Sequence, residues 1–300
     1  MNAVFKGYLR LARPANLPTV MADILAGSAI AGAYGSSFDF SSIGPDIPLK
    51  LVFLIASSVC LYAAGVVLND VFDAKIDRKE RPERPIPSGL VSVKAASFYG
   101  LSLLLAGILL AFWVNVLCGT LAVILALAIV LYDSFSKKYA LLGPINMGIC
   151  RGLNLLLGMG IFGTLIHWSY AGIPLVYIAA ITLISRGEVH GNNKRHIILA
   201  GVLYAIVILA VMVLAFQNTS NMLEVIPFLT LFAILVYGPL WRAYQNNSPG
   251  NIKQAVISGV LALIVLDAAI AVGFSNLLLA GLIVLLLPLS MLLSKLFAVT

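Results

Sequence analysis

The chain has 300 residues, of which 61% are hydrophobic and only 10% are charged, and its mean hydropathy is +1.03. A soluble fold could not keep this much apolar surface away from water, so the composition excludes soluble enzymes, nucleic-acid-binding domains and disordered regulators. The net charge of +7, from 19 Lys and Arg against 12 Asp and Glu, must therefore be interpreted against a membrane rather than nucleic acid.

Long apolar stretches recur along the chain, each of about 16 to 23 residues, enough to cross a hydrocarbon core of roughly 30 Å, in some cases only just. They lack the alternation of an outer-membrane barrel, which excludes strands. The sequence predicts an all-α fold, a polytopic membrane helical bundle in which residues 1–300 form a single transmembrane domain. Nine or ten transmembrane helices are expected, because only Ser275 and Asn276 separate the last two. The expected spans lie near 16–34, 49–69, 93–114, 116–132, 145–166, 171–186, 196–216, 222–241, 255–273 and 277–297.

The first apolar stretch also resembles a secretory signal peptide, because basic residues precede it and Ala29-Ile30-Ala31 resembles a cleavage site. A retained first helix is favoured over this alternative. Asn16 and Asp23 interrupt the stretch, and Pro14 and Pro18 open it.

The basic residues predict the orientation of the bundle. With ten spans and a cytoplasmic N-terminus, Lys50 is the only basic residue that falls on the far side. The acidic Asp39, Asp46 and Glu224 fall there as well. The positive-inside rule then places the N-terminus and the polar loops in the cytoplasm. The residues on that side are Lys6, Arg10, Arg13, Lys75, Arg78, Lys79, Arg81, Arg84, Lys94, Lys137, Lys138, Arg151, Arg186, Lys194, Arg195, Arg242, Lys253 and Lys295.

The most polar segment, residues 69–89, follows the second expected span. If that helix continues, Asn69, Asp70, Asp73 and Asp77 fall within about 100° of arc, because successive residues are 100° apart. Carboxylates at this spacing repel one another unless a cation lies between them. Carboxylate and amide oxygens suit Mg²⁺, which often shares its ligands with substrate phosphates. The alternative is a solvated, charged loop without a ligand.

This segment resembles a known family. Asn69 to Asp77 reads N-D-x-x-D-x-x-x-D, and with residues 84–89, R-P-I-P-S-G, it is similar to the first motif of the UbiA family of membrane prenyltransferases. Residues 13–16, R-P-A-N, and Tyr132 followed by two lysines extend the resemblance. It implies a helical bundle that binds an isoprenyl diphosphate through Mg²⁺ and transfers the prenyl group to a lipophilic, usually aromatic, acceptor.

The second acidic motif of the family, D-x-x-x-D after the sixth span, is altered here. Glu188 and Asn192 keep the i, i+4 spacing, but the second carboxylate is an amide. With residues 143–158, this segment is most similar to the EboC-like branch. Three interpretations stay open: an altered but active site, a member that binds an isoprenoid diphosphate or something else without catalysis, and a structural role for Glu188 in an ion pair with Arg186 or Arg195.

The resemblance and the spacing together give the candidate site. Asp73, Asp77 and Glu188 are the expected catalytic residues, and a loop from Arg78 to Ser88 is the expected lid. The expected Mg²⁺ ligands are Asn69, Asp70, Asp73, Asp77, Glu188 and Asn192. The expected diphosphate contacts are Asn16, Arg84, Lys137, Lys138, Arg151, Lys194 and Arg195.

Three further polar residues lie within expected spans, where such side chains usually face a cavity. Asn154 either lines the diphosphate site or bonds to a neighbouring helix. Asp23 and Asp267 are each consistent with a cavity-facing acid, a proton acceptor or a neutral, hydrogen-bonded carboxyl group. A transporter of a lipophilic metabolite and a polyisoprenoid-binding scaffold remain the competing classes of function. The polar groups gather at one face rather than at the midplane, which argues against a transporter.

Overall fold

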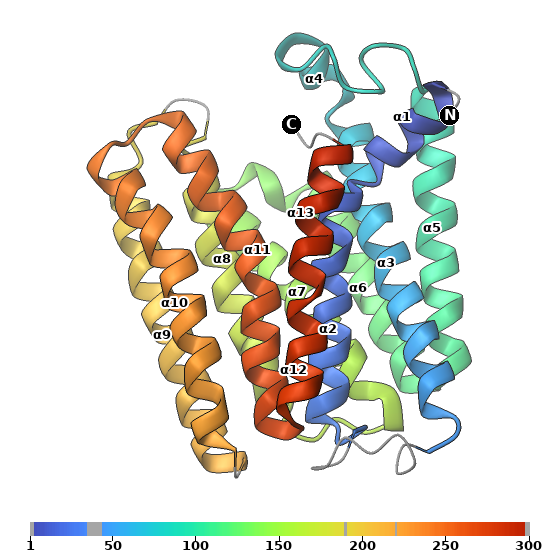
Figure 1. The fold of residues 1–300 in the computed structure, drawn as a ribbon. Coiled ribbons are helices and arrows are strands. Elements are labelled where there is room, and N and C mark those ends of the chain that lie inside the picture. The colour runs from blue at the N-terminus through green and yellow to red at the C-terminus, as the bar shows by residue number, and fades with distance from the viewer. Residues whose placement is uncertain (1–2, 35–43, 189–190, 220, 298–300) are drawn as a thin grey trace.

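The computed structural model describes residues 3–34, 44–188, 191–219 and 221–297 (Figure 1). Within these residues the secondary structure is entirely helical, which confirms the all-α prediction. The helices are α1 (Ala3–Leu11), α2 (Leu17–Ile30), α3 (Ile47–Phe72), α4 (Ala74–Glu80), α5 (Val93–Val114), α6 (Val116–Ser134), α7 (Leu142–Met159), α8 (Gly172–Ser185), α9 (Lys194–Asn218), α10 (Met222–Gln245), α11 (Pro249–Phe274), α12 (Leu277–Val284) and α13 (Leu286–Leu296). Four short 3₁₀ turns are η1 (Pro14–Asn16), η2 (Ser136–Lys138), η3 (Gly160–Phe162) and η4 (Trp168–Ala171).

In the described part of the chain, nine helical segments are long and apolar enough to cross a membrane, with α12 and α13 together forming the last. This confirms the prediction of a polytopic membrane bundle. The remaining expected span is α2, whose 14 residues rise about 21 Å at 1.5 Å per residue. The helix α2 is shorter than the span expected at residues 16–34, because η1 precedes it and Gly32, with φ of 84°, follows its end.

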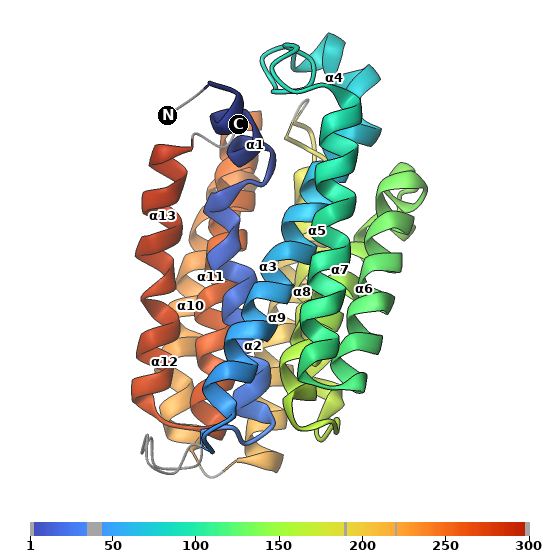
Figure 2. The ribbon, with the colours of Figure 1, turned by 90° about the vertical axis from the view of Figure 1, so that its right-hand side faces the viewer.

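Burial separates the inner helices from the outer ones. In an apolar 18-residue stretch of α11, 72% of the residues are buried, and in that of α7 with η3 the share is 61%. In α5, α9 and α10 it is 28%. Figure 2 shows α12 and α13 along one flank of the bundle and α5 and α6 along the opposite one. In Figure 1, α1 and α4 lie at the same end of the bundle, which we call the α4 end. Most polar residues of the candidate site lie near that end, where α3 meets α4 and where α6 ends.

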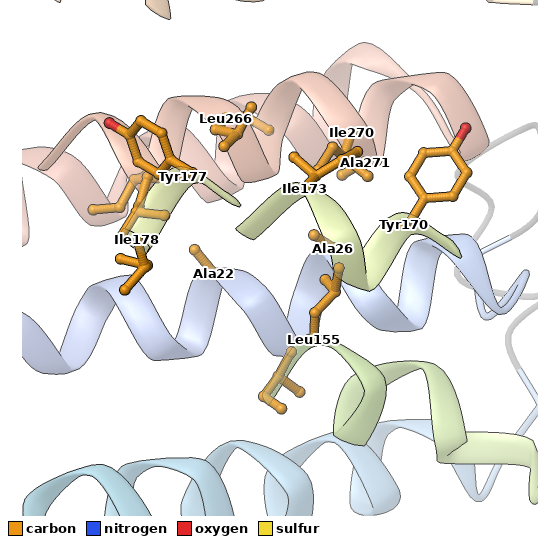
Figure 3. Packing of buried hydrophobic residues seen from close by; sticks show 14 of the residues in the cluster. Ala22, Ala26, Leu155, Tyr170, Ile173, Tyr177, Ile178, Leu266, Ile270 and Ala271 are labelled. Atoms are coloured by element: carbon orange, nitrogen blue, oxygen red, sulfur yellow. The ribbon is translucent and has the colours of Figure 1, made fainter. Parts of the chain in front are cut away.

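Small residues bring α2 close to its neighbours. A Cβ atom added to Gly27 would lie 2.4 Å from the Leu155 carbonyl oxygen, and one added to Gly158 would lie 2.6 Å from that of Ile24. Figure 3 shows Ala22 and Ala26 of α2 on the side that faces α8 and α11. Such close backbone contact, typical of small residues in membrane bundles, holds the polar groups of α2 and α7 within reach of each other.

We therefore expect Gly158→Val to disrupt the contact between α2 and α7. The added side chain meets backbone atoms, which cannot rotate away, so the expected destabilisation is about 1–3 kcal/mol. The matched control is Gly281→Val, inside α12, where an added Cβ meets nothing within 4 Å. Thermal unfolding in detergent measures the difference. Equal melting temperatures for the two variants would contradict this packing account.

Candidate active site

The polar segment after α3 is not one continuous helical face. Asp73 interrupts the helix for a single residue, between Phe72 at the end of α3 and Ala74 at the start of α4. Backbone hydrogen bonds still join Asp73 N to Asn69 O and Asp77 N to Asp73 O, each at 2.9 Å. The four polar side chains divide into two groups with different partners.

Asp70 and Asp77 belong to the first group, which is built on Arg84. The Arg84 Nη1 atom lies 2.8 Å from Asp77 Oδ2 and 3.2 Å from Asp70 Oδ1, and all three residues are buried. Arg13 Nη2 also lies 2.8 Å from Asp70 Oδ1. The guanidinium of Arg84 thus occupies the position between two carboxylates for which the sequence suggested a metal ion. It also ties the loop after α4, the expected lid, to the end of α3.

Asn69 and Asp73 belong to the second group, together with two residues from the end of α6 and from η2. Asn69 Nδ2 donates to Asp133 Oδ1 at 2.8 Å, and Lys137 Nζ lies 2.7 Å from Asp73 Oδ1. Asp133 is buried, and its Oδ2 has no hydrogen-bond partner among the described residues. Asp73 and Lys137 are both close enough to act electrostatically on Asp133. An amide, two carboxylates and an ammonium group therefore meet here.

Asp133 is absent from the sequence-based candidates. The sequence contained a reason to include it, because Asp133 directly follows Tyr132 and lies four residues before Lys137, and both of these residues carried the resemblance. On a helix, that spacing directs the two side chains to the same face.

A cavity of about 320 Å³ lies beside this second group, a volume within the usual range of ligand pockets. At the α4 end its lining is polar, where Arg13, Asn69 and Asp133 lie; farther into the bundle it is mostly apolar, although Ser58 and Asn154 also reach it there. The polar lining is Arg13, Asn16, Thr19, Ser58, Tyr62, Asn69, Tyr132, Asp133, Arg151, Asn154 and Thr182. The apolar lining includes Val20, Val66, Leu125, Ile129, Met147, Ile178, Ile181, Val260 and Leu263. This amphipathic lining suits a molecule with a charged head and a hydrocarbon tail.

Arg151 and Asn154 reach the cavity wall from α7 and are held by α2. Arg151 Nη2 donates to the Thr19 carbonyl oxygen at 2.6 Å, and Arg151 Nε lies 2.7 Å from Asp23 Oδ2. Asn154 Nδ2 donates to the same Asp23 oxygen at 2.6 Å, and Asn154 Oδ1 accepts from Ser58 at 2.7 Å. Asn154 therefore bonds to neighbouring helices, one of the two roles that the sequence left open, and it also lines the cavity.

The second motif does not lie on a helix. The helix α8 ends at Ser185, Glu188 lies in the following turn, and residues 189 and 190 are outside the described part. Gly191 and Asn192 have φ of 68° and 55°, a left-handed conformation that helices do not contain. The expectation that the i, i+4 spacing aligns Glu188 with Asn192 on one helical face is therefore wrong.

Glu188 and the basic residues near it differ in their burial and in the groups around them. Burial raises the pKa of Glu188, and the charges of Lys253 and Arg81 partly oppose this. Lys194 Nζ lies 5.5 Å from the ring centroid of Tyr244, and Asn192, Arg195 and Lys138 are exposed. Of the seven expected diphosphate contacts, Asn16 and Arg151 line the cavity, and Lys137, which is not part of its lining, contacts Asp73.

The sequence was compared with known protein families and relatives. The profile of the UbiA prenyltransferase family matches residues 22–256. The chain belongs to the UbiA prenyltransferase family. The family prediction is confirmed, while the assignment to the EboC-like branch stays a prediction.

A digeranylgeranylglyceryl phosphate synthase from Methanosarcina mazei is 35% identical over 62% of this chain and 64% of its own. The corresponding protein of Methanopyrus kandleri is 32% identical over 52% and 53%. The chain thus spans less than two thirds of the length of these relatives.

Solved structures share the fold of this UbiA-family chain. A structure described as digeranylgeranylglyceryl phosphate synthase has a TM-score of 0.66, at 21% identity, over 91% of this chain and 99% of its own. A UbiA homolog from Archaeoglobus fulgidus, bound to GPP and Mg²⁺, has a TM-score of 0.65, at 15% identity, over 88% and 99%. At these identities the likeness concerns the arrangement of the helices.

The second polar group fits the requirements of Mg²⁺. In the described residues, no three His, Cys, Asp or Glu side chains are grouped to enclose a metal ion. Mg²⁺ does not need such a cage, since it is usually bound by one or two carboxylates, several waters and substrate phosphates. Asp73 and Asp133 supply two carboxylates, and the buried Asp133 Oδ2 has no hydrogen-bond partner in the part of the chain that the structure describes. The donor set therefore suits an ion that a diphosphate helps to hold.

Proposed function

We propose that this UbiA-family chain is an intramembrane prenyltransferase that moves the prenyl group of an allylic isoprenyl diphosphate to a lipophilic acceptor with the assistance of Mg²⁺. One observation carries the proposal: a single cavity is lined by Asn69 and Asp133 at the α4 end and by a mostly apolar set that includes Leu125, Ile178 and Leu263 farther into the bundle. A diphosphate fits the first part and a hydrocarbon tail the second. The prenyltransferase family and the relatives' names support this function.

In the proposed reaction, the bond between the allylic carbon and the diphosphate oxygen breaks, and the electron pair leaves with the pyrophosphate. Mg²⁺, held by Asp73 and Asp133 with Asn69 beside them, would neutralise charge on that leaving group. Lys137 and Arg13 bring positive charge to the same end of the bundle. Since Asp70 and Asp77 already pair with Arg84, we assign them to positioning the loop after α4 rather than to the metal.

The apolar part of the cavity has two tasks in this proposal. Its side chains bury the prenyl tail, and they exclude water that would otherwise capture the allylic cation. The acceptor forms its new bond to the allylic carbon and releases a proton. The relatives are named for making digeranylgeranylglyceryl phosphate. This favours a prenylated glyceryl phosphate as acceptor over the aromatic acceptor expected from the sequence.

We place the α4 end of the cavity on the cytoplasmic side. The basic residues that support this orientation include Lys6 and Arg10 of α1 and Lys75 and Lys79 of α4. Both helices lie at the α4 end of the bundle (Figure 1), and the positive-inside rule assigns that end to the cytoplasm.

The test uses the full chain in lipid nanodiscs with labelled geranylgeranyl diphosphate, Mg²⁺ and two acceptors, geranylgeranylglyceryl phosphate and a lipophilic phenol. A prenylated product from geranylgeranylglyceryl phosphate supports the whole proposal. A prenylated product from the phenol alone would show that the acceptor is aromatic, as the sequence predicted. Mg²⁺-dependent donor binding without any product favours the non-catalytic alternative. Movement of unchanged donor across a proteoliposome membrane would identify a transporter instead.

Asp133 should contribute to this activity although the sequence analysis omitted it. We expect Asp133→Asn to raise the Mg²⁺ concentration needed for half-maximal rate by about tenfold, because one carboxylate charge is lost from the proposed ion site. A titration of the initial rate with Mg²⁺ measures this shift. Asp46→Asn, at the far end of the same bundle, is the control. An unchanged Mg²⁺ requirement in Asp133→Asn would show that Asp133 does not help to bind Mg²⁺.

A further inference from the structure

Two carboxyl groups face each other deep in the bundle, where α2 packs against α11. Asp23 is completely buried, and Asp267 is 3% exposed. Their side chains lie within hydrogen-bonding range of each other. Figure 3 labels Ala22 of α2 and Leu266 of α11, the residues that precede the two acids in the sequence. The reaction proposed above uses neither acid.

The charges at this place do not balance if both acids are ionised. Among the described residues, Arg151 is the one basic side chain that acts electrostatically on the pair. Tyr177 of α8 is a neutral group nearby, and its hydroxyl donates to the Gly259 carbonyl oxygen. Two carboxylates against one guanidinium leave a net negative charge in a dry interior, which is strongly unfavourable. When two carboxyl groups share such a site, one of them keeps its proton.

The hydrogen bonds show which acid keeps the proton. Asp23 Oδ2 lies 2.7 Å from Arg151 Nε and accepts from Asn154 Nδ2 at 2.6 Å, so this group is stabilised as a carboxylate. Asp267 has no comparable ion pair in the described part of the chain. With both groups ionised, Asp23 Oδ1 and Asp267 Oδ2 lack a donor. A proton on Asp267 supplies that donor and satisfies both oxygens.

We propose that Asp267 is a neutral acid that donates a hydrogen bond to the Asp23 carboxylate, and that this pair positions Arg151 on the cavity wall to receive the diphosphate of the donor. The last part rests on the proposed function. Arg151 lines the cavity, while Asp23 and Asp267 lie behind it. Asp267 is thus a positioning residue, and it acts through Asp23. Its proton also keeps a second negative charge away from an anionic ligand.

The test compares two isosteric substitutions in the full chain. Asp267→Asn keeps a neutral donor, so we expect the affinity for geranyl diphosphate with Mg²⁺ to stay within about threefold of the original. Asp23→Asn leaves Arg151 without its counterion, so the affinity should fall at least about tenfold and the melting temperature should drop. Equal losses in both variants, or a greater loss in Asp267→Asn, would overturn the assignment of the proton.

A spectroscopic measurement keeps the proposal testable if Asp23→Asn fails to fold. The infrared difference spectrum between the original protein and Asp267→Asn should contain the carbonyl band of a protonated carboxylic acid at neutral pH. A carboxylate band in its place would refute the shared proton. This readout needs no ligand: if the chain binds no isoprenyl diphosphate at all, the proposed function fails while the proton assignment is still decided.

Discussion

Replacing Asp73 by asparagine should lower the rate of prenyl transfer on the order of 100-fold, the largest loss of activity that we expect from a single substitution. Asp73 lies at the interruption between α3 and α4, beside Asn69, and its carboxylate contacts Lys137. Removing its charge weakens the proposed Mg²⁺ site and leaves the ammonium of Lys137 without its partner. Steady-state kinetics with geranylgeranyl diphosphate would show a lower kcat together with a higher Mg²⁺ requirement.

The control is Asp46→Asn, which removes an exposed carboxylate at the opposite end of α3 and should leave the rate unchanged. Comparing Asp73→Asn with Asp77→Asn separates the two polar groups. We expect Asp77→Asn to act through the stability of the loop after α4, with a smaller effect on the Mg²⁺ requirement. If Asp77→Asn raised that requirement more than Asp73→Asn, the division into two groups would be wrong.

Replacing Arg84 by alanine should release the loop between α4 and α5. Its guanidinium is the shared counterion of Asp70 and Asp77, all three being buried, and breaking a buried ion pair costs about 3–5 kcal/mol. Arg13 still compensates Asp70, so Asp77 is left with the larger penalty. Amide hydrogen exchange in residues 81–92 should rise sharply, because the backbone bonds that fold this loop would open more often.

Arg78→Ala is the matched control, since it removes the same charge from an exposed position in α4. Arg84→Lys should recover part of the protection, because a lysine keeps the charge but cannot present two donors in a fixed plane. Unchanged exchange in Arg84→Ala would show that other contacts hold the loop.

The fold was predictable because it depends on composition and on the length of apolar stretches. The spans needed only hydrophobic runs. Some bounds differ: α2 and α7 end before the expected residues 34 and 166, because turns with Gly32 and Gly163 at positive φ follow them. The resemblance of residues 69–89 to a family motif also held, because short polar motifs survive where the chemistry requires them.

The pairing within the site was not predictable. Helical spacing places Asp70 and Asp77 on one face, but it cannot show that Arg84 folds back between them, since that contact depends on the path of the loop. Asp133 and Asp267 come from helices far away in the sequence, and their partners, Asn69 and Asp23, are set by how the helices pack. The spacing of Glu188 and Asn192 misled because two residues with positive φ, Gly191 and Asn192, follow the end of α8.

The central claim is that the diphosphate and its metal ion bind between α3 and α6. It is tested most directly by an experimental structure of the full chain with geranyl thiodiphosphate, which resists cleavage, and Mn²⁺, which anomalous scattering locates. We predict Mn²⁺ within coordination distance of the carboxylates of Asp73 and Asp133, with the diphosphate at the α4 end of the cavity near Asn16 and the geranyl chain toward Leu263. A metal ion bound to Asp70 and Asp77, with Arg84 displaced, would contradict this account.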